Sequence, residues 1–258
     1  MSASVTNLQV PTRYVVPTHW TASAIRIVVL GAGGNGSEVV DCLSMLHCAI
    51  RSLGHPHGLA VTIIDDAVVR ESNLVRQRFW PCDMGGFKSI VLANRYNLNL
   101  GLQWIGLPHR FPCEETTFAL ADADLIISCV DVNSARMAVA DYKGKLKPTA
   151  MWLDMGNGHR HGQVVFGGLG KATRSRYPNV LDLYPEIAGM ADNTTKSCSA
   201  AESIAAQDCL INRTVATAAM NILWELIRKG STERNWITVS LESGEQMTQP
   251  FPCQNSES

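Results

Sequence analysis

Side chains able to bind phosphate are concentrated between residues 65 and 88 of this 258-residue chain. Arg76 and Lys88 can supply positive charge, and the amides of Asn73 and Gln77 can donate hydrogen bonds. Fixed cations and donors of this kind stabilise the charge that builds up when a carboxylate attacks a nucleotide α-phosphate and pyrophosphate leaves. A single arginine or lysine is more often a solvated surface residue, so the prediction depends on the whole set.

A glycine-rich turn comes before this stretch. Gly31, Gly33 and Gly36 have GxGxxG spacing, with Gly34 between them, directly after the apolar run at residues 25–30. Such glycines let backbone N–H groups approach phosphates, and the start of the following helix favours negative charge. The turn therefore predicts nucleotide binding. The alternative is a turn that only packs a helix against a sheet, and the motif alone does not separate NAD, FAD, SAM and ATP.

Two aspartates stand where buried strands are expected to end. Asp65 follows the run at 59–64, where an acidic side chain can accept hydrogen bonds from a ribose. Asp131 follows the run at 125–130 and offers hard carboxylate oxygens suited to Mg²⁺. Hydride transfer needs few cations beyond a pyrophosphate site, so the cationic cluster favours adenylation.

The elements that must position these residues alternate between strand and helix patterns. We expect strands at 25–30, 59–64, 104–107, 125–130, 149–153 and 162–167. We expect helices at 37–53, 87–97, 133–140 and 211–230. This order predicts an α/β fold, a doubly wound and mostly parallel sheet with helices on both faces. It also predicts an N-terminal arm (1–22), one domain (23–245) and a flexible tail (246–258).

Composition excludes several classes of protein. A formal net charge of -1 argues against a nucleic-acid or membrane-surface partner. No apolar stretch is long enough to span a bilayer, and the N-terminus lacks a secretory signal pattern, so we expect a cytoplasmic protein. The 8 cysteines include no CxxC pair, so we expect no zinc.

Taken together, these motifs resemble those of the ThiF/MoeB/ubiquitin-activating family. The resemblance rests on the glycine turn, the Ser-Asn-Leu-x-Arg-Gln string at 72–77, the Asp-x-Gly-x-x-Lys at 83–88 and the Cys-Val-Asp-x-x-x-x-Arg at 129–136. It covers roughly residues 20–230, and the 72–77 string is its most specific part. It implies a Rossmann-like adenylation domain that binds ATP and Mg²⁺. The expected partner is a ubiquitin-like or sulfur-carrier protein whose C-terminal glycine becomes adenylated.

The resemblance also implies residue roles. Asp65 would hold the ribose, and Asp131 would serve Mg²⁺ and the α-phosphate. The residues implied at the phosphates are Asn73, Arg76, Gln77 and Lys88. The family is usually dimeric and often takes an arginine from the partner subunit's N-terminal arm, so a homodimer is expected, with Arg13 as the candidate.

Four shorter stretches resemble one branch of the family, the ThiF-like proteins of the PRTRC systems. These stretches are residues 152–157, 162–163, 197–199 and 207–208. Two departures stand out. Ala67 occupies a position that is often acidic in the family, although Asp66 can substitute for it, and the family's zinc cysteines are missing.

Cys198 is the candidate for a thiol step. It lies in a polar run beside Lys196, shortly before the late helices. A nearby cation lowers a thiol pKa, and the resulting thiolate can take an acyl group from an adenylate. Family members that form thioesters have a cysteine in a comparable segment. An unreactive loop thiol is the alternative.

Two other functions stay open. One is a dinucleotide-dependent oxidoreductase, whose support ends at the glycine turn and Asp65, since no Tyr-x-x-x-Lys pair accompanies them. The other is a non-catalytic subunit of a heterodimeric activating enzyme. The presence of Arg76, Lys88 and Asp131 argues against this second alternative.

Overall fold

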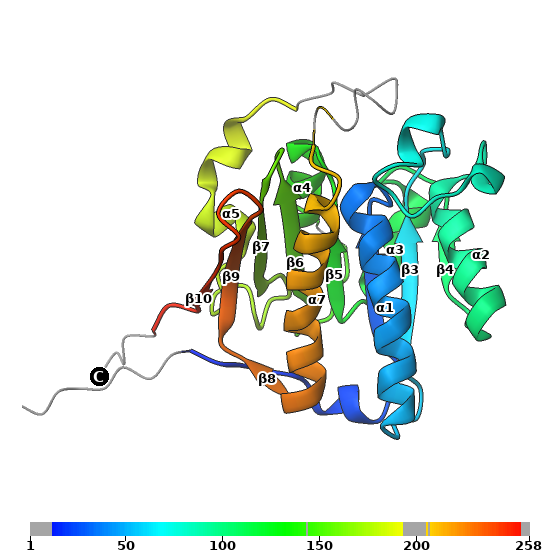
Figure 1. Cartoon of the computed structure of the whole chain (residues 1–258). Helices are drawn as coiled ribbons and strands as arrows, with labels where there is room; N and C mark the ends of the chain where they lie inside the picture. Colours follow the sequence, from blue (N-terminus) through cyan, green and yellow to red (C-terminus); the bar gives the residue numbers. More distant parts are fainter. Residues whose placement is uncertain (1–11, 143, 193–204, 206, 254–258) are drawn as a thin grey trace, which may run out of the picture.

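The chain forms one eight-stranded sheet with the order β10-β9-β7-β6-β5-β2-β3-β4 (Figure 1). The computed structural model describes residues 12–142, 144–192, 205 and 207–253. The strands are β2 (Ile25–Leu30), β3 (Leu59–Ile64), β4 (Ile105–Leu107), β5 (Leu125–Ser128), β6 (Met151–Asn157), β7 (His161–Gly168), β9 (Arg234–Ser240) and β10 (Gln246–Pro250). Pairing is parallel from β4 to β6 and antiparallel from β6 to β10. The predicted doubly wound, mostly parallel sheet is confirmed.

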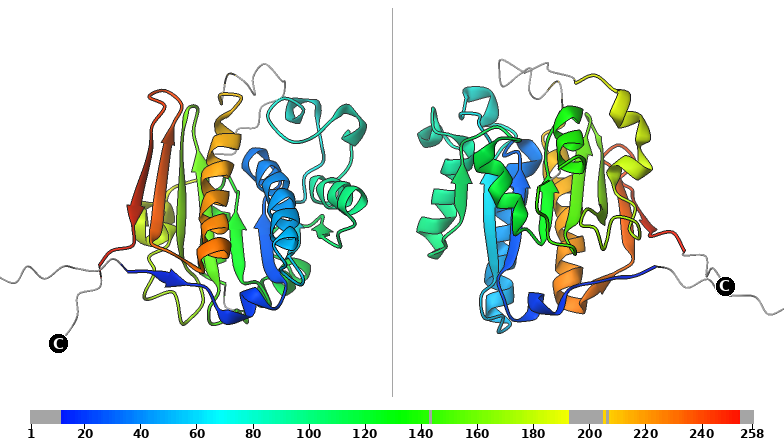
Figure 2. Two further views of the ribbon diagram at one scale, coloured as in Figure 1. Left: turned by 60° about the horizontal axis from the view of Figure 1, so that its bottom comes forward. Right: turned by 180° about the vertical axis from the view of Figure 1, so that it is seen from behind.

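Helices cover both faces of this sheet (Figure 2). One face carries α1 (Gly34–Ser52), α2 (Lys88–Leu100) and α7 (Ile211–Lys229), and the other carries α3 (Glu114–Ala121), α4 (Asn133–Ala140) and α5 (Val180–Leu183). Among the described residues, none of these helices has the length and apolar character that crossing a membrane requires.

Residues of the central strand β2 alternate between two apolar cores. Ile27 and Val29 pack with α1 and α7, whereas Val28 and Leu30 pack on the side of α3 and α4. Because side chains in a strand point to opposite faces in turn, a strand covered on both sides must be apolar throughout. This is why the continuous apolar runs in the sequence predict the parallel strands well.

Segments from near the two ends of the chain pair with each other beside the main sheet, at the bottom in Figure 1. A two-stranded sheet pairs β1 (Tyr14–Val15) with β8 (Ser231–Thr232), and Thr12 bridges to Phe251. Tyr14 and Phe251 are buried there. The described part of the predicted arm therefore packs against the domain. The 3-10 helices are η1 (Thr18–Thr21), η2 (Glu71–Asn73), η3 (Pro81–Asp83) and η4 (Pro185–Gly189).

The prediction of a flexible tail from residue 246 is wrong for residues 246–251. Residues 246–250 form the edge strand β10, which pairs with β9, and the next residue, Phe251, is buried. All five residues of β10 are exposed. An exposed edge strand shows no alternation of apolar and polar residues, so its sequence looks like that of a polar tail.

Several element boundaries also differ from the predictions. Helix α1 begins at Gly34, inside the glycine turn, rather than at residue 37. Helix α3 and strand β9 were not predicted, although β9 shows the alternating burial of a half-covered strand. The helix at 133–140 and the strands at 25–30 and 59–64 are confirmed as predicted.

Candidate functional site

The carboxyl ends of the parallel strands meet along one edge of the sheet, at the top in Figure 1. The chain runs from β2 outward to β3 and β4 and then returns to β5 on the other side of β2. Ligands of open α/β sheets bind where the strand order reverses in this way. The glycine turn follows β2 and Asp131 follows β5, so both border the reversal point.

Three of the four predicted glycines leave no room for a side chain. A Cβ at Gly36 would lie 1.9 Å from the Gly31 carbonyl oxygen, and one at Gly34 would lie 2.6 Å from the Asn212 side chain. Gly31 has a φ of +88°, where a Cβ is strained. At Gly33, by contrast, an added Cβ would meet no atom of the described residues within 4 Å. Gly33 therefore faces open space where a ligand can approach the backbone.

Asp65, directly after β3, is hydrogen-bonded to the glycine turn. Its carboxylate accepts hydrogen bonds from the backbone N–H of Ala32 at 2.6 Å and of Ala67 at 2.8 Å. Burial raises the pKa of the Asp65 carboxyl, while the Ala32 N–H and the charge of Lys88 act against that shift. The carboxylate is therefore held in one orientation beside the glycine turn, with lone pairs left to accept further hydrogen bonds.

Lys88 begins helix α2 close to Asp65. The residue is buried, at 8% exposure, and its Nζ lies 5.9 Å from the centre of the Phe79 ring. The Lys88 backbone N–H donates to the Ala67 carbonyl at 2.9 Å, and the Ser89 hydroxyl donates to the Asp65 carbonyl at 2.9 Å. These bonds fix the start of α2 against the end of β3. The structure thus brings Lys88 and Asp65 together.

Arg76 is held near the glycine turn by residues around the start of α7. Its Nη1 donates to the Oδ1 of Asn212 at 3.2 Å and also to the side chain of Gln207. Asn212 in turn donates from Nδ2 to Asn35 at 2.9 Å and to Asn157 at 3.3 Å. Burial lowers the pKa of Arg76, but an arginine stays charged. A fixed cation therefore lies beside the first turn of α1.

Asn212 is the central residue of this polar network, and the sequence analysis missed it. It is 3% exposed, and its hydrogen bonds join the first turn of α1, the end of β6 and the loop of Arg76. The available signal was a polar residue on the otherwise apolar stripe of α7, between Ile211 and Val215. That signal marks a buried amide, but it does not identify the partners of the amide.

The other two amides of the predicted phosphate site differ from each other. The Asn73 Oδ1 accepts a hydrogen bond from the Arg70 backbone N–H at 2.9 Å, so this side chain shapes the 3-10 turn η2. The Gln77 Oε1 is buried, and the described part of the chain gives it no hydrogen-bond partner. Gln77 therefore has unused hydrogen-bonding capacity, and the Asn73 amide nitrogen is a further donor.

Asp131 is exposed between β5 and α4, at the carboxyl edge of the sheet. The arginine of the same motif, Arg136, has a structural contact instead. Its Nε lies 3.0 Å from both carboxylate oxygens of Asp154, and its guanidinium also donates to the Met155 carbonyl. Burial raises the pKa of Asp154, and Arg136 opposes the shift. This buried pair fixes α4 to β6 beside Asp131.

Two predicted residues are not part of this arrangement. Arg13 is exposed and pairs with Glu233 at 2.7 Å, beside β1 and β8 at the end of the sheet opposite the glycine turn (Figure 1). The chain's own Arg13 is therefore remote from the site. Cys198 lies outside the described residues.

We expect Asn212→Ala to lower the free energy of unfolding by about 2 kcal/mol, because it leaves the buried Asn35 amide oxygen without its donor. Chemical denaturation measures the loss. Thr217→Ala, an exposed position on the same helix, is the control and should change stability by less than about 0.5 kcal/mol. Equal effects of the two substitutions would contradict the role given to Asn212.

Comparison with known proteins identifies the family of this chain and solved structures with a similar fold. The ThiF family model matches residues 18–256. No curated protein matches the chain. Similar solved structures include E. coli MccB with MccA-N7isoASN (16% identity, TM-score 0.61), E. coli MccB with ATP (15%, 0.59) and PaaA (14%, 0.59).

These structural matches cover most of this chain but less of the other proteins. They include 89% of this chain for the two MccB structures and 88% for PaaA, but only 65%, 64% and 64% of the respective matched chains. This chain therefore spans less than two thirds of the length of those proteins. At such low identity the likeness demonstrates a shared fold.

Proposed function

Because the chain belongs to the ThiF family, we propose that it is an ATP-dependent adenylating enzyme. A substrate carboxylate oxygen attacks the α-phosphorus of ATP and forms an acyl-adenylate. The bond from the α-phosphorus to the bridging oxygen breaks, and pyrophosphate leaves with that oxygen. The protein's task in such a reaction is to position the two reactants and to stabilise charge on the phosphate oxygens.

The observation that carries this proposal is the placement of Arg76. Asn212 contacts both Arg76 and Asn35, and Asn35 belongs to the first turn of α1. One buried amide thus links the cation, through the Asn35 side chain, to the first turn of α1, where a phosphate would bind. Hydride transfer builds up no charge on phosphate oxygens, whereas the departure of pyrophosphate does, and a fixed arginine stabilises that charge.

The remaining residues fit Mg-ATP. Gly33 faces open space, so the backbone of the turn can approach the phosphates. Asp65 can accept from the ribose, and Lys88 adds a second cation next to it. Asp131 is exposed and its oxygens suit Mg²⁺, which would neutralise phosphate charge when bound.

We assign the substrate carboxylate to the C-terminal glycine of a ubiquitin-like or sulfur-carrier protein, within the PRTRC branch. The resemblance of the 72–77 and 129–136 motifs to activating enzymes supports the carrier, and the stretches at 152–157, 162–163, 197–199 and 207–208 support the branch. A short peptide is the alternative, because one similar structure is a microcin C7 biosynthetic enzyme, MccB, in complex with N-formylated MccA.

We also propose a homodimer in which each copy supplies Arg13 to the site of the other. The remoteness of Arg13 from its own site supports this arrangement, because a second copy would be needed to bring the two together. Cys198 is proposed as the acceptor in a later thiol step.

Pyrophosphate exchange into ATP tests the function. We expect exchange that requires a glycine-ended carrier or a peptide, and that falls in Asp131→Asn because the Mg²⁺ ligand is weakened. Absence of exchange with every such substrate would count against adenylation. A fluorescence titration that shows NAD(H) bound in preference to ATP would support the oxidoreductase instead. Failure of the purified chain to bind Mg-ATP would support a non-catalytic subunit.

A further inference from the structure

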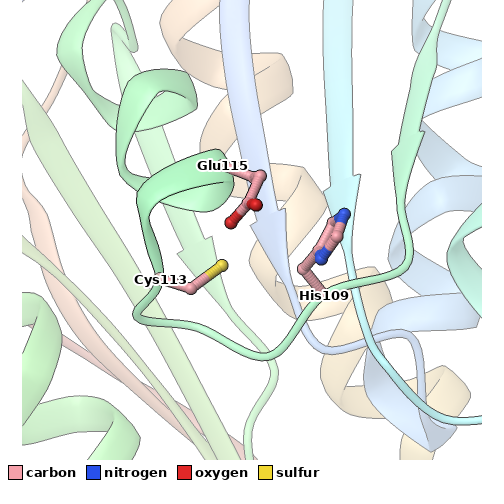
Figure 3. Close-up of side chains that lie close together, drawn as sticks. All are labelled: His109, Cys113 and Glu115. Carbon is pink, nitrogen blue, oxygen red and sulfur yellow. The ribbon is translucent and has the colours of Figure 1, made fainter.

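Three side chains of the kinds that bind transition metals meet where the loop after β4 joins the start of α3. They are His109, Cys113 and Glu115, and one ligand atom from each lies within 4.8 Å of the other two. Figure 3 shows the imidazole, the sulfur and the carboxylate around a shared space between the loop and the start of the helix. The function proposed above uses none of the three.

The position of the cysteine is fixed by its own helix. Cys113 is the residue before α3, and its backbone N–H donates to the Thr116 hydroxyl oxygen at 2.9 Å. Thr116 is fully buried, and its Oγ1 also approaches the Cys113 sulfur at 3.5 Å. The buried Thr116 hydroxyl therefore fixes the position of the sulfur. Metal ligands are commonly oriented by hydrogen bonds of this kind.

The other two ligands approach from either side. His109 is partly buried and lies two residues after β4, whose Leu107 carbonyl accepts the Asp65 backbone N–H at 3.2 Å. Glu115 lies in the first turn of α3 and is exposed, so its carboxylate can rotate. The three ligands thus come from two segments that are each anchored to the sheet or to a buried residue.

The donor set selects the class of metal. A thiolate, an imidazole and a carboxylate suit Zn²⁺ and its neighbours, whereas Mg²⁺ prefers oxygen alone. Ligand atoms around a tetrahedral zinc lie about 3.3–3.8 Å apart. The three ligand atoms, which lie within 4.8 Å of one another, would each move by about 1 Å to bind one ion. Rotation of the Glu115 and His109 side chains can supply this movement.

We propose that His109, Cys113 and Glu115 form a zinc-class metal site, which shares no residue with the Mg-ATP site proposed above. On binding, the Cys113 thiol gives its proton to solvent and the sulfur bonds to the metal as a thiolate. Three protein ligands leave a fourth position for water or another ligand. The ion would clamp the loop after β4 to the start of α3. Such a site has a single cysteine, so the lack of CxxC pairs in the sequence does not exclude it.

The test is metal titration of the full chain after treatment with a chelator. We expect one equivalent of Co²⁺ to give a thiolate-to-cobalt charge-transfer band, and Zn²⁺ to displace it. Cys113→Ser and His109→Ala should each weaken binding at least about 100-fold. Cys48→Ser, which changes an exposed cysteine on α1, is the matched control and should bind like the unaltered chain.

The proposal is wrong if the cobalt spectrum lacks the thiolate band, or if the band survives Cys113→Ser. It is also wrong if Cys48→Ser removes the band. Glu115→Gln alters an exposed side chain and keeps the test valid should Cys113→Ser fail to fold. Mg-ATP binding is measured in parallel, so a failure of the metal site is distinguished from a failure of the adenylation proposal.

Discussion

Arg76→Ala lowers the rate of pyrophosphate exchange by about 100- to 1,000-fold, which is the usual cost of removing one fixed donor that stabilises a transition state. The arginine is held beside the first turn of α1 by Asn212 and Gln207, so its charge needs no rearrangement when the phosphate oxygens become more negative. We expect the effect mainly in the maximal rate and less in the apparent affinity for ATP.

Arg70→Ala is the matched control. Arg70 lies on the same loop but is exposed, and its side chain has no role in the proposed reaction. Exchange by this variant should stay within about twofold of the unaltered enzyme. Thermal unfolding of both variants is measured as well. An Arg76→Ala enzyme that keeps full exchange activity, or an equal loss in both variants, would refute the role given to Arg76.

Gly36→Ala lowers the free energy of unfolding by about 3 kcal/mol or more. The added Cβ would lie 1.9 Å from the Gly31 carbonyl oxygen, and a backbone atom cannot rotate away as the end of a side chain can. The turn between β2 and α1 must therefore open. Urea denaturation gives the size of the loss, and reduced yield of folded protein is expected alongside it.

Gly33→Ala separates packing from ligand binding. The added Cβ meets no described atom within 4 Å, so we expect a stability loss of about 1 kcal/mol or less. Affinity for Mg-ATP should nevertheless fall, because the methyl group occupies the space that a phosphate would use. Calorimetric titration measures this fall. If Gly33→Ala binds Mg-ATP normally, the nucleotide does not lie against this glycine.

The parallel half of the fold was predictable because its strands are buried on both faces. Residues 25–30 and 59–64 are nearly continuous apolar runs, and each becomes a strand with the predicted bounds. The glycine turn was predictable for a related reason. Close packing against neighbouring segments excludes side chains at Gly31, Gly34 and Gly36, and this leaves a visible spacing in the sequence.

The antiparallel half was harder to predict. Strand β10 is exposed at every residue, so its pairing with β9 leaves no hydrophobic pattern to detect. Such a strand is held by backbone hydrogen bonds, which depend little on residue type. The same reason explains why residues 246–250 resemble a tail.

Contacts within the site were only partly accessible from sequence. Residue type indicated that Arg76 and Lys88 could serve phosphates, but the partner that positions Arg76 lies 136 residues away, on α7. Arg136 illustrates the opposite case. Its spacing from Asp131 belongs to the motif, and yet its side chain binds the buried Asp154. The spacing of a motif identifies residues of one motif, but it does not show which residues their side chains contact. Those contacts are visible only in the folded structure.

A crystal structure of the chain with a non-hydrolysable Mg-ATP analogue tests the central claim most directly. We predict the triphosphate against the backbone at Gly33, with the Arg76 guanidinium and the Lys88 ammonium within hydrogen-bond distance of its oxygens. A nucleotide bound elsewhere would contradict the account, as would both cations turned away from a triphosphate at Gly33.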